Sequence, residues 1–196
     1  MTAELPETPS AHSPAPDWMH RPITAEEYDS LPEEACADIE IVDGMVVMSP
    51  SATKRHNLVA QELTYALKAA SGADWRAGMD FDVRLQDVPL IIRRPDVIVF
   101  RADALDIEPT RPEHILLVVE VVSPGSETTD RVTKPAQYAR AGIKYYWRVE
   151  QANGPAPEVF TYLLDPATST YRATEVFTGQ VKATAPFPVE VDLTAI

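Results

Sequence analysis

Two carboxylates stand in segments of the sequence that otherwise look like buried β-strands. Asp96 follows Pro95 and precedes the apolar residues 97–100, and Glu120 lies within the apolar run 115–122. A carboxylate in a buried strand costs several kcal/mol unless it is paired, protonated or bound to a metal ion. Two such acids on neighbouring strands indicate a shared cation, so they are the first candidates for a functional site.

Each of these acids also has a purely structural explanation. Asp96, at the start of a strand, could face water or pair with Arg93 or Arg94. Glu120 has valines on both faces of its strand, which leaves a buried Glu–Arg pair as the alternative to a metal ligand or a general base. The side chains that surround the two carboxylates in the folded protein decide between these interpretations.

A third acid stands in a similar setting. Glu40 lies between Ile39 and Ile41 on a predicted hairpin strand, where the exposed face of an amphipathic hairpin would also explain it. Such carboxylates are the oxygen ligands that Mg²⁺ or Mn²⁺ prefers. A bound ion would offset the repulsion among the three acids and could activate a water molecule for attack on phosphorus.

Basic residues near these acids are candidates for the same site. Lys134 lies fourteen residues after Glu120, on the helix expected to follow that strand, with Asp130 one turn earlier. An i,i+4 surface pair explains Asp130 and Lys134, but the lysine could instead point back toward Glu120. His56, the last residue of the string KRH, is either a solvated residue at a helix start or a phosphate contact.

Three segments that bear on these candidates are predicted to be helical. Thr24 and Glu27 form a capping-box pattern at the start of a short helix, and residues 53–70 carry apolar side chains at helical spacing. Residues 128–141 form a third predicted helix that ends at Gly142. Pro135 lies inside it, so the helix either starts late or loses a hydrogen bond near its first turn.

The remaining patterns predict strands and turns. Asp43-Gly44, between two β-rich runs, predicts a hairpin with a type I′ turn in which Glu40 opposes Val47. The run 115–122 is the most apolar strand and is expected to be central. The other predicted strands are 79–86, 90–100, 144–149, 159–164 and 171–177, the last three with turns at Asn153-Gly154 and Asp165-Pro166 between them. This order predicts an α/β protein with a mixed sheet.

Composition limits the class of protein. The chain has 196 residues, of which 45% are hydrophobic and 24% charged, as in an ordinary globular protein. We expect a disordered, proline-rich tail over residues 1–22 and a single domain over 23–196. No apolar run approaches the roughly 20 residues that span a bilayer, and the N-terminal segment does not resemble a secretory signal, so we expect no membrane association and a cytoplasmic location.

Charge and cysteine content exclude some kinds of site. Cys36 is the single cysteine, which excludes an internal disulfide and a zinc cluster built on cysteines. The net charge of −13 argues against nonspecific nucleic-acid binding, which depends on lysine and arginine. The segment 131–148 is an exception, because it carries five basic residues and no acid, and it leaves room for an anionic ligand.

Taken in order, several strings resemble those of the Uma-two family of endonucleases, a branch of the PD-(D/E)XK nuclease superfamily. The strings are IEIVDGMVVMSPSATKRH, PDVIV, VVEVVSP and AGIKYYW, and the resemblance covers about residues 24–165. It implies a restriction-endonuclease-like core: a central mixed β-sheet flanked by helices, here with additional C-terminal β-hairpins, and a metal site on the second and third core strands.

The resemblance also implies roles for particular residues. Asp96 matches the motif aspartate, Glu120 the acid of (D/E)XK, and Glu40 the acid of the upstream segment. Val122 stands where the superfamily usually has lysine, which implies that the lysine function has migrated to Lys134.

The implied activity is metal-dependent hydrolysis of DNA phosphodiester bonds. Asp96 and Glu120 would hold Mg²⁺ or Mn²⁺, and Glu40 would complete the shell directly or through water. Lys134 would orient the attacking water or stabilise developing charge, with Asp130 and His56 in supporting positions. We expect a nuclease of this size to cut both strands as a homodimer, for which the C-terminal hairpins offer a candidate interface.

Two other functions stay open at this point. The departure at Val122 and the acidic balance of the chain favour a catalytically inactive nuclease-like domain that binds nucleic acid or a protein. An unrelated β-rich binding protein would instead leave the acids apart, each paired with an arginine.

Overall fold

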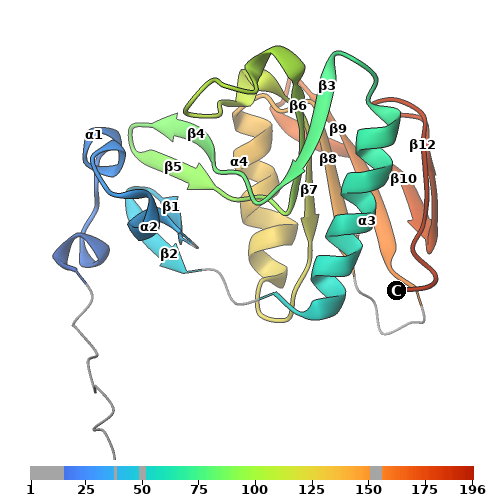
Figure 1. Cartoon of the computed structure of the whole chain (residues 1–196), viewed down its shortest axis with the longest axis horizontal. Helices are drawn as coiled ribbons and strands as arrows, with labels where there is room; N and C mark the ends of the chain where they lie inside the picture. The colour runs from blue at the N-terminus through green and yellow to red at the C-terminus, as the bar shows by residue number, and fades with distance from the viewer. Residues whose placement is uncertain (1–15, 38, 49–51, 151–155) are drawn as a thin grey trace, which may run out of the picture.

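A six-stranded mixed sheet forms the centre of the molecule in a computed structural model that describes residues 16–37, 39–48, 52–150 and 156–196. In order across the sheet its strands are β10 (Thr170–Thr178), β9 (Glu158–Asp165), β8 (Tyr145–Glu150), β7 (Ile115–Val121), β6 (Val97–Arg101) and β3 (Trp75–Met79) (Figure 1). Strands β7 and β8 are parallel and the other neighbours are antiparallel. The predicted central position of the strand that carries Glu120 is confirmed.

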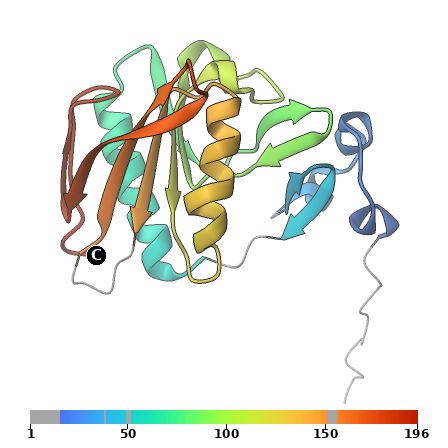
Figure 2. The same cartoon turned by 180° about the vertical axis from the view of Figure 1, so that it is seen from behind.

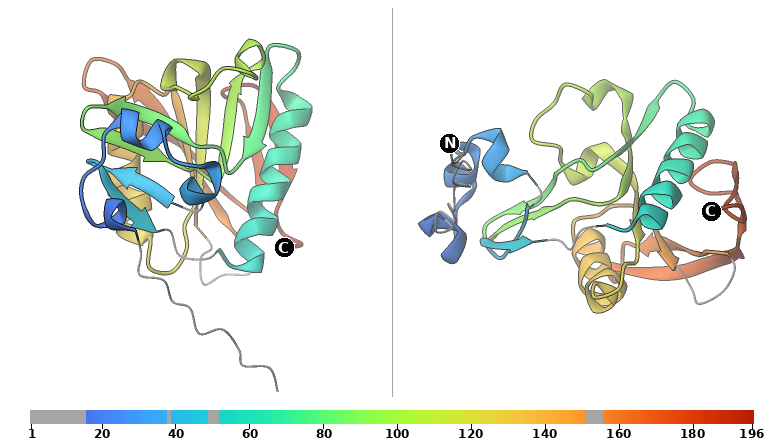
Figure 3. Two further views of the ribbon diagram at one scale, coloured as in Figure 1. Left: turned by 60° about the vertical axis from the view of Figure 1, so that its left-hand side comes forward. Right: turned by 60° about the horizontal axis from the view of Figure 1, so that its bottom comes forward.

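Two helices cover opposite faces of this sheet, α3 (Lys54–Ala70) and α4 (Lys134–Arg140) (Figure 3). Because side chains alternate along a strand, Val97 and Val119 pack in the core cluster beneath α3. Ile98 and Val118 pack in the cluster beneath α4. The predicted α/β class, with a central mixed sheet flanked by helices, is therefore confirmed.

A second, four-stranded sheet stands beside the core and carries the N-terminal elements. Its order is β2 (Met45–Met48), β1 (Ile39–Val42), β5 (Leu90–Arg93) and β4 (Val83–Asp87), with α1 (Ala25–Asp29), α2 (Glu33–Cys36) and the 3-10 helix η1 (Asp17–His20) next to it (Figure 1). It has its own small apolar cluster, which includes Ile23, Ile41 and Ile92.

The two local signals that begin this part of the chain are confirmed. Thr24 accepts a hydrogen bond from the Glu27 amide while the Glu27 carboxylate accepts one from the Thr24 amide, which is a complete capping box. Strands β1 and β2 pair antiparallel with Glu40 opposite Val47. Gly44 occupies the turn at φ +81°, where a Cβ would lie 3.1 Å from the Ile23 carbonyl oxygen.

The C-terminal hairpins are also present. The predicted turn at Asp165-Pro166 joins β9 to β10, and β11 (Gln180–Ala183) pairs with β12 (Val189–Asp192) as a separate hairpin beside α3 (Figure 2). The predicted turn at Asn153-Gly154 lies outside the described residues.

Several predicted boundaries were wrong. Residues 79–86 are not one strand, because β3 ends at Met79 and β4 begins at Val83. Residues 90–100 form two strands in different sheets, β5 and β6, and the break falls at Arg94-Pro95-Asp96. Proline has no amide hydrogen for a ladder, so the chain leaves one sheet at Pro95 and enters the next with Asp96 at the start of β6.

Two further predictions need adjustment. The predicted disordered tail extended to residue 22, whereas Asp17–His20 form η1 and the Trp18 side chain packs on the apolar cluster of the small sheet. The predicted helix 128–141 begins as a π-helical turn, η4 (Thr129–Thr133), and becomes α-helical at Lys134. Pro135 thus falls in the first turn of α4, where its missing amide costs least.

The remaining short elements connect the strands. The 3-10 helices η2 (Ala102–Ala104) and η3 (Pro112–His114) lie between β6 and β7. Within the described ranges, no helix is long and apolar enough to cross a membrane.

Candidate active site

The register of β6 and β7 brings the two acids to the same end of the central sheet. Ile98 lies opposite Val118 and Val97 opposite Val119, so the next step along both strands sets Asp96 beside Glu120. The main-chain amide of Val121 donates a 2.6 Å hydrogen bond to Asp96 Oδ2, which fixes this approach. The predicted neighbouring positions of the two acids are therefore found in the structure.

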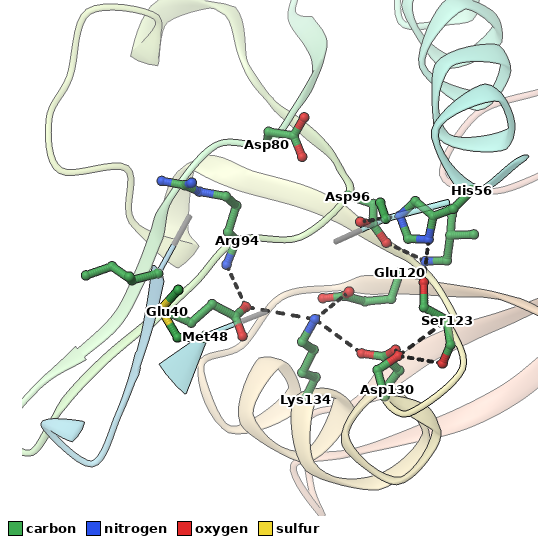
Figure 4. Close-up of a pocket in the computed structure, with 14 residues that line it drawn as sticks. Glu40, Met48, His56, Asp80, Arg94, Asp96, Glu120, Ser123, Asp130 and Lys134 are labelled. Atoms are coloured by element: carbon green, nitrogen blue, oxygen red, sulfur yellow. Dashed lines mark hydrogen bonds and ion pairs between the residues drawn. The ribbon is translucent and has the colours of Figure 1, made fainter. Parts of the chain in front are cut away.

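Both acids line a cleft of about 520 Å³ between the central sheet, the small sheet and the start of α4 (Figure 4). The lining includes every candidate from the sequence, namely Glu40, His56, Asp96, Glu120, Asp130 and Lys134. Sites for small molecules and reacting groups are commonly concave and of this size. The alternative of an unrelated β-rich binding protein, whose acids would lie apart, does not fit this grouping.

Glu120 is buried, and both of its oxygens have partners. The Lys134 Nζ lies 2.8 Å from Oε2, and the Tyr138 hydroxyl donates a 2.5 Å hydrogen bond to Oε1. Burial raises the pKa of Glu120 to about 8, although the Lys134 ammonium acts to lower it and the neighbouring Asp96 charge adds to the rise. The ionised form of Glu120 therefore depends on positive charge beside it, which Lys134 supplies and to which a bound cation would add.

Lys134 points into the cleft, not to solvent. Its Nζ lies 3.2 Å from Asp130 Oδ1 and 3.8 Å from Glu40 Oε1, in addition to its contact with Glu120 (Figure 4). Burial acts to lower the pKa of Lys134, but the negative charges of these three acids outweigh it and raise the pKa above its usual value. Lys134 is thus a protonated ammonium at neutral pH.

The π-helical turn before α4 helps to aim this lysine. Asp130 is buried, its Oδ2 accepts a 2.5 Å hydrogen bond from Ser126, and its main-chain carbonyl accepts a 2.7 Å hydrogen bond from Tyr146. A π-helical turn is wider than an α-helical one and is frequent at functional sites. The i,i+4 pair of Asp130 and Lys134 is a buried contact and not the surface pair that was the alternative.

His56 lies beside Asp96 at the start of α3. Its Nε2 is 2.9 Å from Asp96 Oδ1 and its Nδ1 is 2.9 Å from the Ser123 hydroxyl. Burial acts to lower the pKa of His56, but the hydrogen bond and charge of Asp96 outweigh it, so the pKa is raised. With both ring nitrogens engaged, His56 is placed to hold Asp96 in position.

Glu40 faces the same cleft from the small sheet, but its nearest cation is an arginine. Its Oε2 lies 2.8 Å from Arg93 NH1 in a buried ion pair, and its Oε1 accepts a 2.9 Å hydrogen bond from the Arg94 amide. The buried Glu–Arg pair that was the alternative for Glu120 therefore occurs at Glu40. The Arg94 side chain forms an ion pair with Asp82, with Nε 2.8 Å from Oδ1.

Sequence reasoning did not nominate three residues that contact or line the cleft, namely Tyr138, Ser126 and Asp80. Arg93 was considered only as a partner for Asp96, whereas it pairs with Glu40. Tyr138 lies four residues after Lys134, and Ser126 lies four residues before Asp130. Because residues four apart share one face of a helix, this spacing could have nominated both. Asp80 follows β3 at a positive φ of 57° and lines the cleft. No pattern in the sequence indicated this position.

The oxygen donors of the cleft fit a hard divalent cation. Asp96 and Glu120 present carboxylate oxygens to the cleft, and these are the ligands that Mg²⁺ and Mn²⁺ favour. Over the described ranges, no three His, Cys, Asp or Glu side chains are grouped closely enough to hold an ion as they stand. Two protein carboxylates with water in the other positions is an arrangement that Mg²⁺ accepts.

Comparison with known families decides the affiliation. Residues 25–195 match the family model Uma2, whose description is "Putative restriction endonuclease". The chain belongs to the Uma2 family. The resemblance inferred from the sequence strings is thereby confirmed, and Uma2 membership extends it to the C-terminal hairpins.

A solved structure supports the fold of this Uma2 chain. A crystal structure from Anabaena variabilis, described as a putative nuclease of DUF820, matches 85% of this chain and 90% of its own with a TM-score of 0.62 and 21% identity. At that identity the likeness shows a shared fold. A search of curated proteins gave no match.

Proposed function

We propose that this Uma2 protein is a divalent-metal-dependent DNA endonuclease that hydrolyses phosphodiester bonds. The observation that carries the proposal is the meeting of Asp96, Glu120 and Lys134 in one cleft, with Lys134 Nζ 2.8 Å from Glu120. Family membership supports the nuclease class, and the oxygen donors support Mg²⁺ or Mn²⁺.

Asp96 and Glu120 would hold the ion, with the Val121 carbonyl as a further oxygen. Glu40, engaged with Arg93, would reach it through water. When bound, the ion would supply charge neutralisation at the phosphate and a more acidic water molecule. His56 and the Val121 amide keep Asp96 in place, since each bonds one of its carboxylate oxygens.

Lys134 would act through its charge. Its raised pKa keeps the ammonium protonated, so it is unsuited to remove a proton from water. An ammonium held by Glu120 and Asp130 can instead orient the attacking water or stabilise charge that develops on the phosphorane. The migrated-lysine interpretation, proposed from the resemblance, is consistent with this position.

A second candidate function is a catalytically inactive domain that binds nucleic acid or a protein. Two observations favour it: Glu120 already has Tyr138 and Lys134 on its two oxygens, and Val122 stands at the usual lysine position. Cleavage with divalent metal separates the two functions.

The test is nicking of supercoiled plasmid DNA by purified protein with Mg²⁺ or Mn²⁺. We expect the wild type to nick the plasmid, and Asp96→Asn and Glu120→Gln to lose about a hundredfold or more in rate, as when a charge-stabilising group is removed from an active site. Asp103→Asn, at an exposed aspartate outside the cleft, is the matched control and should nick normally. Undiminished nicking in both cleft variants would refute the assignment of the site.

Two broader features accompany this proposal. We propose the cytoplasm as the location, and a homodimer as the form that cuts both strands of a duplex. The candidate interface is the exposed side of the C-terminal hairpins.

A further inference from the structure

A second hollow lies on the same sheet face as the active-site cleft, on the other side of α4. We call it the α4 groove. It encloses about 470 Å³ between the helix residues Arg131, Ala136 and Arg140 and the strand residues Tyr162 and Tyr171. Figure 2 shows α4 beside the β9–β10 hairpin that forms the far wall. The cleft uses residues at β6 and β7, whereas the groove uses residues of β8, β9 and β10, so the two hollows are separate.

Aromatic rings form the floor of the groove. The Tyr146 ring is buried and lies 5.4 Å from the Tyr171 ring in a stacked arrangement and 5.6 Å from the Tyr162 ring. The Arg148 guanidinium lies 5.6 Å from the centre of Tyr162. Tyr162 and Tyr171 are partly exposed, so two rings border the surface of the groove, and exposed aromatic rings are the kind of platform on which nucleobases stack.

The charge of the groove is opposite to that of the whole molecule. Three arginines line it, and among the described residues of its lining there is no aspartate or glutamate. Arg131 and Arg148 share Glu150, at 2.8 and 2.9 Å. Arg140 is exposed, and no hydrogen bond or ion pair of its side chain occurs within the described ranges. On a chain of net charge −13, this local excess of positive charge favours an anion.

Polar groups complete the groove at its rim. The turn between β9 and β10 contributes Thr168, Ser169 and Thr170, whose hydroxyls can donate to or accept from a sugar or phosphate. A volume of about 470 Å³ is within the range of sites for small ligands. An aromatic floor, an arginine without a partner and a hydroxyl rim together match a nucleoside phosphate better than a simple anion.

We propose that the α4 groove binds a nucleoside phosphate, with the base on the tyrosine floor and the phosphate at Arg140. The ligand class rests on the proposed nuclease function, since nucleotides are what such an enzyme meets. The same chemistry has two sources, a free mononucleotide or a nucleotide unit of a single DNA strand.

Binding measured without metal keeps this question apart from cleavage. In EDTA, fluorescence anisotropy follows a fluorescein-labelled 12-nucleotide single strand, and calorimetry follows deoxyadenosine monophosphate, with inorganic phosphate as a third probe. The variants are Arg140→Ala, which removes the free guanidinium, and Ala136→Glu, which adds a carboxylate at an exposed helix position. Arg172→Ala is the matched control, because Arg172 is exposed on β10 next to Tyr171 and its side chain leaves from the opposite face.

We expect the wild type to bind the mononucleotide, the strand or both, and Arg140→Ala to weaken binding about tenfold, as for loss of a charged hydrogen bond. Ala136→Glu should weaken it at least as much and Arg172→Ala less than twofold. Binding of the mononucleotide alone assigns the free nucleotide as ligand, and binding of the strand assigns a DNA unit. Equal binding by Arg140→Ala and wild type, or competition by inorganic phosphate as effective as by the mononucleotide, overturns the proposal. Plasmid nicking that still depends on Asp96 and Glu120 would then leave the proposed function standing.

Discussion

At the scale of single residues, Glu120 is held at both of its carboxylate oxygens. Lys134 and Tyr138 each contact one of its oxygens, and all three side chains are buried. The carboxylate therefore has one orientation in which both oxygens are satisfied. Tyr138 acts on the site through Glu120, which makes it a positioning residue.

Removing the Tyr138 hydroxyl tests this constraint. Tyr138→Phe should lower the free energy of unfolding by about 1.5–3 kcal/mol, because the lost hydrogen bond is to a buried carboxylate. Tyr171→Phe, which removes a 2.7 Å hydrogen bond to the neutral Ile143 carbonyl, is the control and should cost about 1 kcal/mol. Urea unfolding measures both. A Tyr138→Phe cost equal to or below that of Tyr171→Phe would contradict the account of Glu120.

At the scale of elements, one buried group links the small sheet directly to α4. Arg93, at the end of β5, forms an ion pair with Glu40 of β1 and also donates a 2.8 Å hydrogen bond to Gln137 of α4. Because α4 also carries Lys134, this contact sets the distance between the small sheet and the active-site helix. Glu40 is thereby held at the rim of the cleft.

Removing Arg93 alone should destabilise the fold more than removing both Arg93 and Glu40. Arg93→Met should cost about 3–5 kcal/mol in the free energy of unfolding, since it removes the nearest cation from the buried Glu40 carboxylate and leaves only the more distant Lys134, at 3.8 Å. Adding Glu40→Leu to that variant should restore most of the loss, because the uncompensated charge is removed with its partner. Denaturant unfolding of both proteins provides the measurement, and a double variant less stable than Arg93→Met would contradict this explanation.

Elements with short-range signals were predictable from the sequence, and those set by distant partners were not. The capping box at Thr24 and the turn at Asp43-Gly44 are each fixed by a few neighbouring residues. Pro95 marked a strand start at Asp96, but the change of sheet between 90–93 and 97–101 was missed because the pairing partners of the two segments lie far away in the sequence. Lys134 was named from the sequence as a possible partner of Glu120, but Arg93 on Glu40 and Tyr138 on Glu120 lie 53 and 18 positions away, which no local pattern encodes.

At the scale of the whole molecule, the clustered acids predict a stability that depends on divalent metal. An ion that binds the native state and not the unfolded chain stabilises it by about 1.4 kcal/mol at ten times its dissociation constant. For a domain of this size that corresponds to a rise of about 3–6 °C in melting temperature.

Thermal unfolding with Mg²⁺ or Mn²⁺ checks this expectation. Wild type should show the rise in melting temperature, and Glu120→Gln should not, because it lacks the carboxylate that holds the ion. The exposed control Asp103→Asn should respond as wild type does. An equal response in Glu120→Gln would place the bound ion elsewhere.

The central claim is that Glu120 and Lys134 work as one catalytic unit, and the rates of plasmid nicking in Mg²⁺ by Glu120→Gln, Lys134→Met and the double variant test it most directly. Circular dichroism confirms that each variant is folded, and Lys68→Met, at an exposed lysine of α3, is the control. We predict that each single variant loses about a hundredfold or more, and that the double variant is no slower than the slower single variant, since members of one unit are not additive. Nicking by Lys134→Met at the wild-type rate would contradict the account.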